Sequence, residues 1–265
     1  MAVPIKIAIV LRPASGGMAR HVETLLAALN ASRVEFVIFA PASTRLHLHN
    51  IRRVDLEIPA AVSPIRDLKA IAALRRRLEA DSIRLVHAHG LRTLWICASA
   101  ARGQGLPLLF TAHNVPRVSL MSRLILKRAI SAGFRAIAVS NAVADRLRLL
   151  GVPHGFISVI PNGINLSEFT ALPPVHAVRE SWKLAQNDLV IAGVGRLSEE
   201  KGFQILLEAA ARLFGRFPHL RLLIAGDGPM APQLRERARE LEDSAGTQRI
   251  RFCGQISNVA GLLAA

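Results

Sequence analysis

Short apolar runs alternate with amphipathic segments along almost the whole chain. Runs with the character of buried strands occupy residues 5–11, 34–40, 54–58, 83–89, 107–113, 135–140, 156–163, 189–194, 220–225 and 249–253. Between them, apolar side chains recur at a helical spacing, most clearly over 65–78, 141–150 and 203–217. Strands that alternate with helices predict a parallel sheet covered on both faces, so the predicted fold class is α/β.

A change of pattern near residues 166–178 divides the chain into two such regions. This segment contains the pair Pro173-Pro174, which is typical of a linker. We therefore predict two Rossmann-like, doubly wound parallel-sheet domains that cover residues 1–170 and 175–265. The second has three predicted strands, half the number of a six-stranded doubly wound sheet, so we expect it to be incomplete.

Composition narrows the class of protein. With 51% hydrophobic residues, a chain of 265 residues has ample material for a packed core. Cys97 and Cys253 lie far apart in apolar runs, which argues against a disulfide framework and favours a reducing, cytoplasmic compartment. We find no apolar run with the length of a secretory signal or of a membrane-spanning helix.

The formal net charge of +15 predicts an anionic partner, which could be a nucleic acid, a membrane surface or a phosphorylated substrate. Stacking on bases requires exposed aromatic rings. The chain has no tyrosine and only 5% aromatic residues, so nucleic acid is disfavoured as a partner.

In doubly wound sheets the ligand lies beyond the carboxyl ends of the strands. Glycines or polar residues lie at the carboxyl ends of several predicted strands. They are Gly16, Gly17, His87, His89, His113, Asn114, Ser140, Asn141 and Asn162. His87 and His89 share one face of a strand and could begin a metal site, but the sequence presents no third ligand, so we predict no metal. His113 either faces the crevice as a hydrogen-bonding group or is a core histidine satisfied by the backbone.

Two junctions between a strand and a helix have the composition of an anion site. Arg196 and Lys201 occupy the loop after the strand at 189–194, close to the free amides and positive dipole end of a helix. A solvated loop with ordinary surface charges is the alternative. Gly16 and Gly17 follow the first strand, but they lack the G-x-G-x-x-G spacing of a dinucleotide site, so a tight turn is the alternative there.

Eight motifs in order resemble the glycosyltransferases of family 4, which have the GT-B fold. They are SGG, HAHG, TAHN, AVSNAVADRL, IPNGIN, GVGRLSEEKGFQILLEAAARL, LLIAGDGP and IRFCGQI, and they extend from residue 15 to residue 256. The resemblance implies two Rossmann-like domains facing a cleft, with a nucleotide-sugar donor held mainly by the second. It also implies transfer with retention at the anomeric carbon, with no required metal ion and no cofactor.

The resemblance also implies roles for individual residues. Arg196 and Lys201 match the family's diphosphate-binding pair, and His113 matches the histidine beside the transferred sugar. These three are the predicted catalytic residues. Further predicted donor contacts are the glycine loop and the turn that would lie by the nucleobase, at Gly16, Gly17, Gly254 and Ile256. Other candidates for lining the cleft are His89, Asn114, Asn162 and Asp227, although Asp227 is better placed to hold its own turn.

The chain departs from the family pattern at one point. The family's E-x7-E element, whose glutamates contact the donor sugar and the ribose, would follow about where this sequence ends. We therefore expect the chain to be truncated and inactive by itself. Two alternatives stay open: a sugar-nucleotide epimerase of the same fold, which needs an acid and a base at the sugar, and a non-catalytic module that binds anions or membranes.

One segment of the first domain fits an anionic membrane surface. Over residues 118–134, apolar side chains such as Leu124 alternate with Arg123, Lys127 and Arg128, and the helix at 65–78 carries three consecutive arginines. The prediction is a peripheral position on the cytoplasmic membrane face, with a sugar or lipid-linked acceptor from glycan or cell-envelope synthesis. The alternative is a helix that covers the sheet and exposes solvated charges.

Overall fold

The computed structural model describes residues 4–13, 16–29, 34–48, 50–59, 62–170, 172, 174–243, 248–256 and 258–265. The chain forms two compact units, residues 1–164 and 165–265. The boundary thus precedes the linker that the proline pair predicts. Pro173 of that pair, Ser15 of the SGG motif and Ser257 of the predicted nucleobase turn lie outside the described residues.

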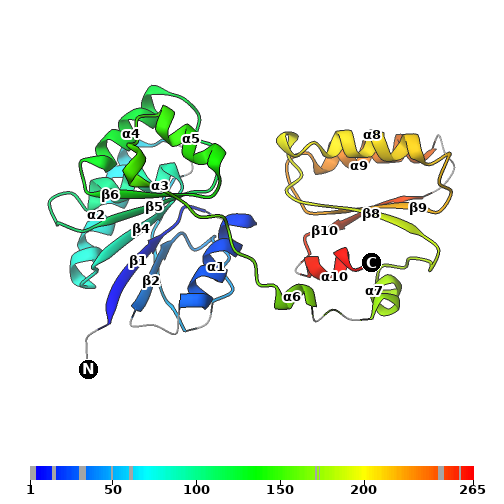
Figure 1. The fold of residues 1–265 in the computed structure, drawn as a ribbon, viewed down its shortest axis with the longest axis horizontal. Coiled ribbons are helices and arrows are strands. Elements are labelled where there is room, and N and C mark those ends of the chain that lie inside the picture. Colours follow the sequence, from blue (N-terminus) through cyan, green and yellow to red (C-terminus); the bar gives the residue numbers. More distant parts are fainter. Residues whose placement is uncertain are drawn as a thin grey trace. The chain divides into compact units, whose positions relative to one another are not determined.

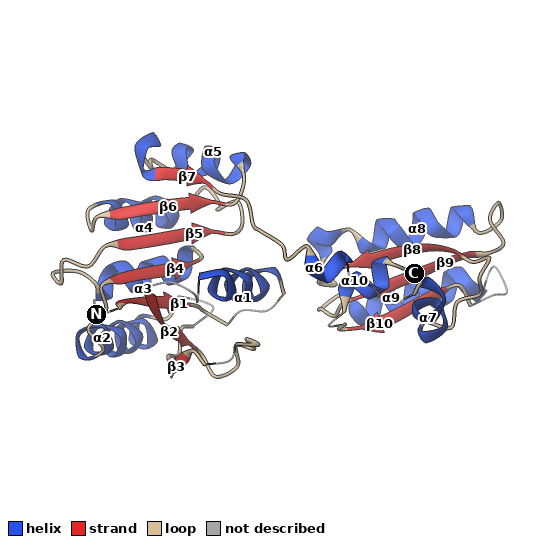
Figure 2. Cartoon of the chain, turned by 60° about the horizontal axis from the view of Figure 1, so that its bottom comes forward, coloured by secondary structure: helices blue, strands red, loops and turns tan. Residues whose placement is uncertain are grey.

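The first unit contains a seven-stranded sheet in which every neighbouring pair is parallel, as the alternating pattern predicts (Figure 2). Its strand order is β3-β2-β1-β4-β5-β6-β7. The strands are β1 (Ile5–Val10), β2 (Val34–Ala40), β3 (Arg52–Asp55), β4 (Leu85–His89), β5 (Leu108–Ala112), β6 (Phe134–Ala138) and β7 (Ile157–Val159).

Helices cover both faces of this sheet (Figure 1). Helix α1 packs through Val22 and Leu26 against one face, while the buried sides of α2, α3, α4 and α5 form the larger core on the other. The helices are α1 (Gly17–Leu29), α2 (Pro64–Ala80), α3 (Leu91–Ala100), α4 (Leu120–Ile130) and α5 (Asn141–Leu149), followed by the short turn η1 (His154–Phe156). The described part of the first unit is therefore a doubly wound α/β layer structure.

The strand order reverses between β1 and β4, because β1 is followed in the sheet by β2 on one side and by β4 on the other. The loops that leave the carboxyl ends of these two strands diverge to opposite faces of the sheet. This divergence opens the crevice in which doubly wound proteins bind their ligands. The ends of β1, β4 and β5 are therefore where functional side chains of this unit are expected.

Serine caps begin two of the helices that cover the sheet. The Ser140 hydroxyl accepts a hydrogen bond from the Val143 amide at 3.3 Å, so Ser140 is the N-cap of α5. Ser119 caps α4 in the same way, through the Ser122 amide at 3.1 Å. Each cap satisfies an amide that the helix itself leaves without a partner.

The second unit contains a three-stranded parallel sheet of order β10-β9-β8, built from β8 (Leu189–Val194), β9 (Leu220–Ala225) and β10 (Ile250–Gly254). One face is covered by two long helices and the other by Trp182 and a short helix (Figure 1). The helical elements are α6 (Ser167–Thr170), α7 (Val175–Ser181), η2 (Glu199–Lys201), α8 (Phe203–Leu213), α9 (Ala231–Asp243) and α10 (Val259–Leu263). None of the described helices of either unit is both long and apolar enough to cross a bilayer.

Candidate functional site

Histidines line the carboxyl end of β4, next to the point where the strand order reverses. His87 lies beside Ile9 in the register of β4 and β1, and Ile9 belongs to the apolar layer under α1. His87 and His89 therefore face the α1 side of the sheet, where their side chains are buried. The predicted placement of both imidazoles on one strand face is confirmed.

Two more histidines reach the same place from other elements. His89 Nδ1 lies 2.9 Å from Nε2 of His113, the first residue after β5, and the two rings are stacked. The ring of His21, from α1, lies 5.0 Å from that of His113 and 5.9 Å from that of His89. The pair that the sequence suggests is not the group that the structure assembles: His89 lies with His113 and with His21, which α1 brings over the end of β4 across more than sixty residues of sequence.

Burial keeps these histidines neutral near pH 7. Loss of hydration, assisted by neighbouring histidine charges, lowers the pKa of His87 to about 3 and that of His113 to about 4. Burial lowers the pKa of His21 and, more strongly, that of His89. Each neutral ring has one donor and one acceptor nitrogen. His113 is half-buried and can therefore offer a ring nitrogen to a hydroxyl in the crevice.

One hydrogen bond anchors the buried end of the cluster. His87 Nε2 lies 2.8 Å from the hydroxyl oxygen of Thr111 on β5, and Thr111 is itself buried. At the exposed end, Asn114 follows His113 directly and lies at the surface. Asn162 lies apart from this group, since it follows β7, the last strand of the sheet and three positions from β4. The structure brings together His89, His113 and Asn114 but not Asn162.

The glycine loop lies at the carboxyl end of β1. Gly16 has the left-handed φ of 62°, and its carbonyl accepts the Arg20 amide at 3.0 Å, so it starts the hydrogen bonding of α1. A Cβ atom at Gly16 or Gly17 would meet no heavy atom within 4 Å. The first amides of α1 therefore border open space, as backbone that approaches a ligand must.

In the second unit, the loop after β8 carries the two predicted diphosphate-binding cations. Arg196 and Lys201 are exposed, and neither makes an ion pair with a described residue. The loop also carries the exposed Glu199 and Glu200 in η2, so cations and carboxylates balance in number. An anion must therefore be bound here by hydrogen bonds that the cations and backbone amides direct at it, rather than by an excess of positive charge.

A glycine turn after β9 fixes this loop. The Leu197 amide donates to the Asp227 carbonyl at 3.0 Å, and the Met230 amide donates to the Leu197 carbonyl at 2.9 Å. A Cβ atom on Gly226 would lie 1.8 Å from the Gly195 carbonyl oxygen, and one on Gly228 would lie 2.3 Å from that of Leu197. Only glycine permits this approach. The loop after β8 and the glycine turn after β9 are thus held together next to Arg196.

The side chain of Asp227 holds this turn, because its Oδ1 accepts the Gly228 amide at 2.8 Å. Lys201 ends η2, and Gly202, at a φ of 68°, then starts α8 without a side-chain cap. The first amides of α8 are therefore left without a capping side chain, next to Lys201. The geometry departs from the expected simple loop, since a turn of 3-10 helix that ends at Lys201 lies between Arg196 and α8.

The remaining predicted donor contacts lie at the end of β10. Gly254 has a φ of 68°, and its carbonyl accepts the Gly226 amide at 2.7 Å, which joins it to the glycine turn. Ile256 packs in the apolar layer under α10 together with Leu262 and Trp182. The structure therefore groups Arg196, Asp227 and Gly254 at one end of the small sheet.

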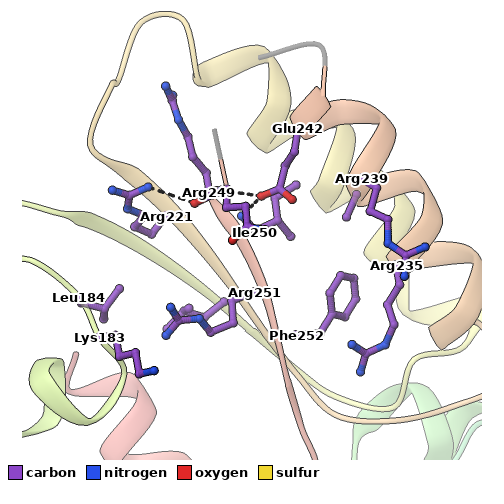
Figure 3. A pocket seen from close by; sticks show the side chains of 13 residues that line it. Lys183, Leu184, Arg221, Arg235, Arg239, Glu242, Arg249, Ile250, Arg251 and Phe252 are labelled. Carbon is purple, nitrogen blue, oxygen red and sulfur yellow. Dashed lines mark hydrogen bonds between the residues drawn. The ribbon is translucent and has the colours of Figure 1, made fainter. Parts of the chain in front are cut away.

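A cavity of about 470 Å³ lies elsewhere on the second unit, around the edge strand β10 (Figure 3). Six cations line it: Lys183, Arg221, Arg235, Arg239, Arg249 and Arg251. Its one carboxylate, Glu242, accepts the backbone amides of Arg249 and Ile250. None of the predicted donor-binding residues lines this cavity. Arg251 is the one of these six that lies on the edge strand itself, where a charged side chain disfavours pairing with other chains.

Sequence reasoning missed His21 and the steric role of Gly226 and Gly228. His21 falls next to the apolar stripe of its helix, so periodicity alone does not single it out. The available signal was the number of histidines near the ends of neighbouring strands, which indicates that a further histidine could join them. For the glycines, the signal was their alternation in the GDGP turn, which indicates close backbone approach.

These features define a class: a two-unit α/β protein with ligand-binding loops at the carboxyl ends of parallel strands. The profile of glycosyltransferase family 4 matches residues 15–168, and the profile of the glycosyl transferases group 1 matches residues 188–265. Since the first match alone covers more than half of the chain, the protein belongs to glycosyltransferase family 4. This assignment favours a transferase over the epimerase that the sequence left open.

Individual relatives agree with the family. The chain is 30% identical over 168 residues to the phosphatidylinositol N-acetylglucosaminyltransferase gpi3 subunit of Schizosaccharomyces pombe, covering 60% of this chain and 35% of the relative. It is 24% identical over 249 residues to the alpha-monoglucosyldiacylglycerol synthase of Acholeplasma laidlawii, covering 84% and 62%. The structure of Anabaena Alr3699/HepE in complex with UDP and glucose superposes with a TM-score of 0.81 at 20% identity, covering 98% of this chain and 72% of that one.

The likeness to HepE establishes the fold, and the predicted GT-B fold class is confirmed. The chain spans 35% and 62% of the lengths of the two curated relatives named above. Which sugar, which acceptor and which activity belong to the whole protein are therefore matters of proposal.

Proposed function

We propose that this chain carries the donor-diphosphate site and the histidine-lined sugar site of a retaining glycosyltransferase, which moves a sugar from a nucleoside-diphosphate sugar to an acceptor. One observation supports this above others. Arg196 is exposed, makes no ion pair with a described residue, and extends from a loop whose neighbours Gly195 and Leu197 are held by backbone hydrogen bonds. An exposed guanidinium on a loop held by backbone hydrogen bonds, at the carboxyl end of a strand, is suited to a phosphate, even though Glu199 and Glu200 lie on the same loop.

The chemistry of the reaction explains why these groups are needed. When the bond between sugar and diphosphate breaks, negative charge develops on the phosphate oxygens. Arg196 and Lys201 would each donate charge-assisted hydrogen bonds to these oxygens, and the first amides of α8 would add the positive end of the helix dipole. Because the loop is rigid, this stabilisation requires little reorganisation when the charge develops.

His113 would orient the sugar. Its ring is neutral and half-buried, and its Nε2 is already engaged with His89 Nδ1, which leaves Nδ1 to bond a sugar hydroxyl. A neutral imidazole can donate to or accept from a hydroxyl without placing a charge beside it. In this proposal His89 is a positioning residue, because it fixes the ring of His113 and is too buried to touch the sugar.

For the acceptor we propose a lipid-linked molecule at an anionic membrane surface. Leu120, Met121 and Leu124 of α4 are 74%, 51% and 49% exposed, and Arg123 and Lys127 of the same helix are exposed beside them. The start of α4 follows the loop from His113, so a short segment of chain connects this apolar and basic surface to the proposed sugar site within one unit. The two curated relatives are also named for lipid molecules, a phosphatidylinositol and a diacylglycerol.

The predicted basic contribution of α2 is only partly retained in this proposal. Ile65 and Leu68 are strongly exposed near the start of α2, next to the exposed Arg66 and Lys69. The arginine run at 75–77 lies at the other end of the helix, where Arg75 approaches Glu79 at 3.9 Å. The N-terminal ends of α2 and α4 therefore form the proposed membrane-facing surface, and the arginine run does not belong to it.

Donor binding tests the proposal without requiring turnover. UDP is titrated into the purified chain by calorimetry, and Arg196→Ala or Lys201→Ala is expected to weaken binding by about 1.5 to 3 kcal/mol, the value of a hydrogen bond to a charged group. Arg212→Ala is the matched control, since Arg212 is an exposed cation at the other end of α8. Equal affinities for all three variants and the unaltered chain would remove Arg196 and Lys201 from the site.

A further inference from the structure

We propose that His21, His89 and His113 together form a binding site for a divalent transition-metal ion of the zinc type, in addition to any role in sugar transfer. One ring nitrogen from each of the three histidines can be chosen so that all lie within 4.8 Å of one another. The residues come from α1, β4 and the loop after β5, so the fold rather than a local motif assembles the cluster.

The geometry is close to that of a three-histidine site. Zinc binds imidazole nitrogens at about 2.0 to 2.1 Å, and tetrahedral geometry then spaces the nitrogens by about 3.4 Å. The contact between His89 Nδ1 and His113 Nε2, at 2.9 Å, is already near this spacing. His21 is half-buried, and its ligand atom lies within 4.8 Å of the other two, so its side chain must rotate closer for the ion to bind.

The chemistry of the donors selects the class of ion. All three ligands are imidazoles, and the described cluster includes no carboxylate. Imidazole nitrogen suits zinc, copper, nickel and cobalt, whereas magnesium and calcium require oxygen ligands. A coordinating ring nitrogen must not carry the ring proton, so the proton shared between His89 Nδ1 and His113 Nε2 has to move to another ring nitrogen when the ion binds.

The surroundings provide further support. His21 and His113 both reach solvent, so an ion has an entry path and keeps a fourth position for water. His87, whose ring lies 4.2 Å from that of His89, packs behind the site and is held by Thr111.

Occupation of this site would engage the same His113 that we assign to the sugar, a consequence that rests on the proposed function. The ion would bind Nε2 of His113 and leave Nδ1 to the sugar hydroxyl, so a bound zinc ion would fix the orientation of the ring in place of its hydrogen bond to His89. The binding site itself does not depend on that assignment, because it follows from the positions of the three rings. Binding of the metal alone therefore tests the inference separately.

The experiment uses the whole chain without a histidine tag, after treatment with a chelator. Zn²⁺ is titrated by calorimetry, and Co²⁺ by its visible absorption, whose intensity distinguishes four-coordinate from six-coordinate ions. We expect one ion per chain, and we expect His21→Ala to reduce the affinity by at least about tenfold, since even partners outside the ligand shell have effects of this size. Mg²⁺ is expected to give no binding.

Two variants make the outcome decisive. His154→Ala removes an exposed histidine of the same unit outside the cluster, and its affinity for Zn²⁺ should match that of the unaltered chain. His113→Gln supplies a second ligand deletion, so the test does not depend on the folding of the His21 variant. Failure of the unaltered chain to bind Zn²⁺, or equal affinity in His21→Ala, His113→Gln and His154→Ala, would overturn the inference. UDP binding measured in parallel keeps this result separate from the donor site.

Discussion

The contact between the glycine turn and the Arg196 loop makes a sharp prediction for Gly226→Ala. The new methyl group would lie 1.8 Å from the Gly195 carbonyl oxygen and 2.9 Å from its carbon, closer than the 3.0 Å that real Cβ atoms keep. Because the obstacle is backbone, no side chain can rotate away. The turn and the loop must instead separate by about 1 Å, an amount that packed protein interiors do not absorb freely.

The magnitude follows from the contacts that separate. Gly226 has a φ of 139°, a region nearly closed to alanine, and such strain costs about 1 to 3 kcal/mol. Separation also weakens the hydrogen bonds from the Gly226 amide to the Gly254 carbonyl, at 2.7 Å, and from the Gly195 amide to the Ala225 carbonyl, at 2.9 Å. Each is worth about 1 kcal/mol, so the expected loss of unfolding free energy is about 3 to 5 kcal/mol in total.

Urea unfolding followed by tryptophan fluorescence measures this loss. In a Trp95→Phe background, Trp182 is the only tryptophan and reports on the second unit. Gly215→Ala is the matched control, since a Cβ at Gly215 would meet no heavy atom within 4 Å. In conditions where the variant stays folded, UDP affinity should also fall for Gly226→Ala, because Arg196 is displaced with its loop. If Gly226→Ala unfolds at the same urea concentration as Gly215→Ala, the described contact between turn and loop is wrong.

Two further predictions concern the first unit. The chain should sediment with anionic phosphatidylglycerol vesicles at low salt but not at high salt, since each cation near the surface adds about 1 kcal/mol. Replacing Leu120 and Leu124 with serine should weaken this binding, whereas Leu149→Ser, an exposed leucine of α5, should not; absence of sedimentation at low salt would refute the membrane proposal. The pKa of His87 is lowered from 6.5 to about 3 in the folded chain. Between these two values His87 binds more protons in the unfolded chain than in the folded one. The free energy of unfolding must therefore fall as the pH is lowered from 6.5 towards 3. With chelator present and Trp95 as reporter, His87→Asn should show a smaller fall over this range, and identical pH profiles would contradict the assignment.

Sequence patterns predicted the fold class and most strands because a doubly wound sheet is built from apolar runs of recognisable length. The errors lie at strand ends. The predicted strand at 83–89 begins at Leu85, because the Ile83 amide bonds back to the Leu78 carbonyl and ends helix α2. The predicted strand at 54–58 instead covers Arg52–Asp55, since charged residues are tolerated in an edge strand and Arg52 is held by Asp81 at 2.8 Å.

The candidate site was predictable only as separate loops. Strand-end rules and family motifs identify Arg196, Lys201 and His113, because each follows a strand that the pattern detects. They cannot identify His21 as a neighbour of His89, since the angle at which α1 crosses the sheet decides that contact. In the same way, GDGP is visible as a turn, but its approach to Gly195 depends on the register of β8 against β9.

The dependence of the Arg196 loop on a neighbouring strand has a consequence for how this family can vary. The geometry of the loop is set by hydrogen bonds to residues about thirty positions later, not by the length of the helix and turn in between. Insertions or deletions in the exposed turn at 215–218, at the opposite end of the sheet, would therefore leave Arg196 in place. A single added residue between Gly226 and Met230 would shift every partner of the loop. Changes in loop length are thus tolerated at the 215–218 end of the small sheet but not at the end that carries the glycine turn. The surface of the protein can therefore change while its proposed phosphate site stays constant.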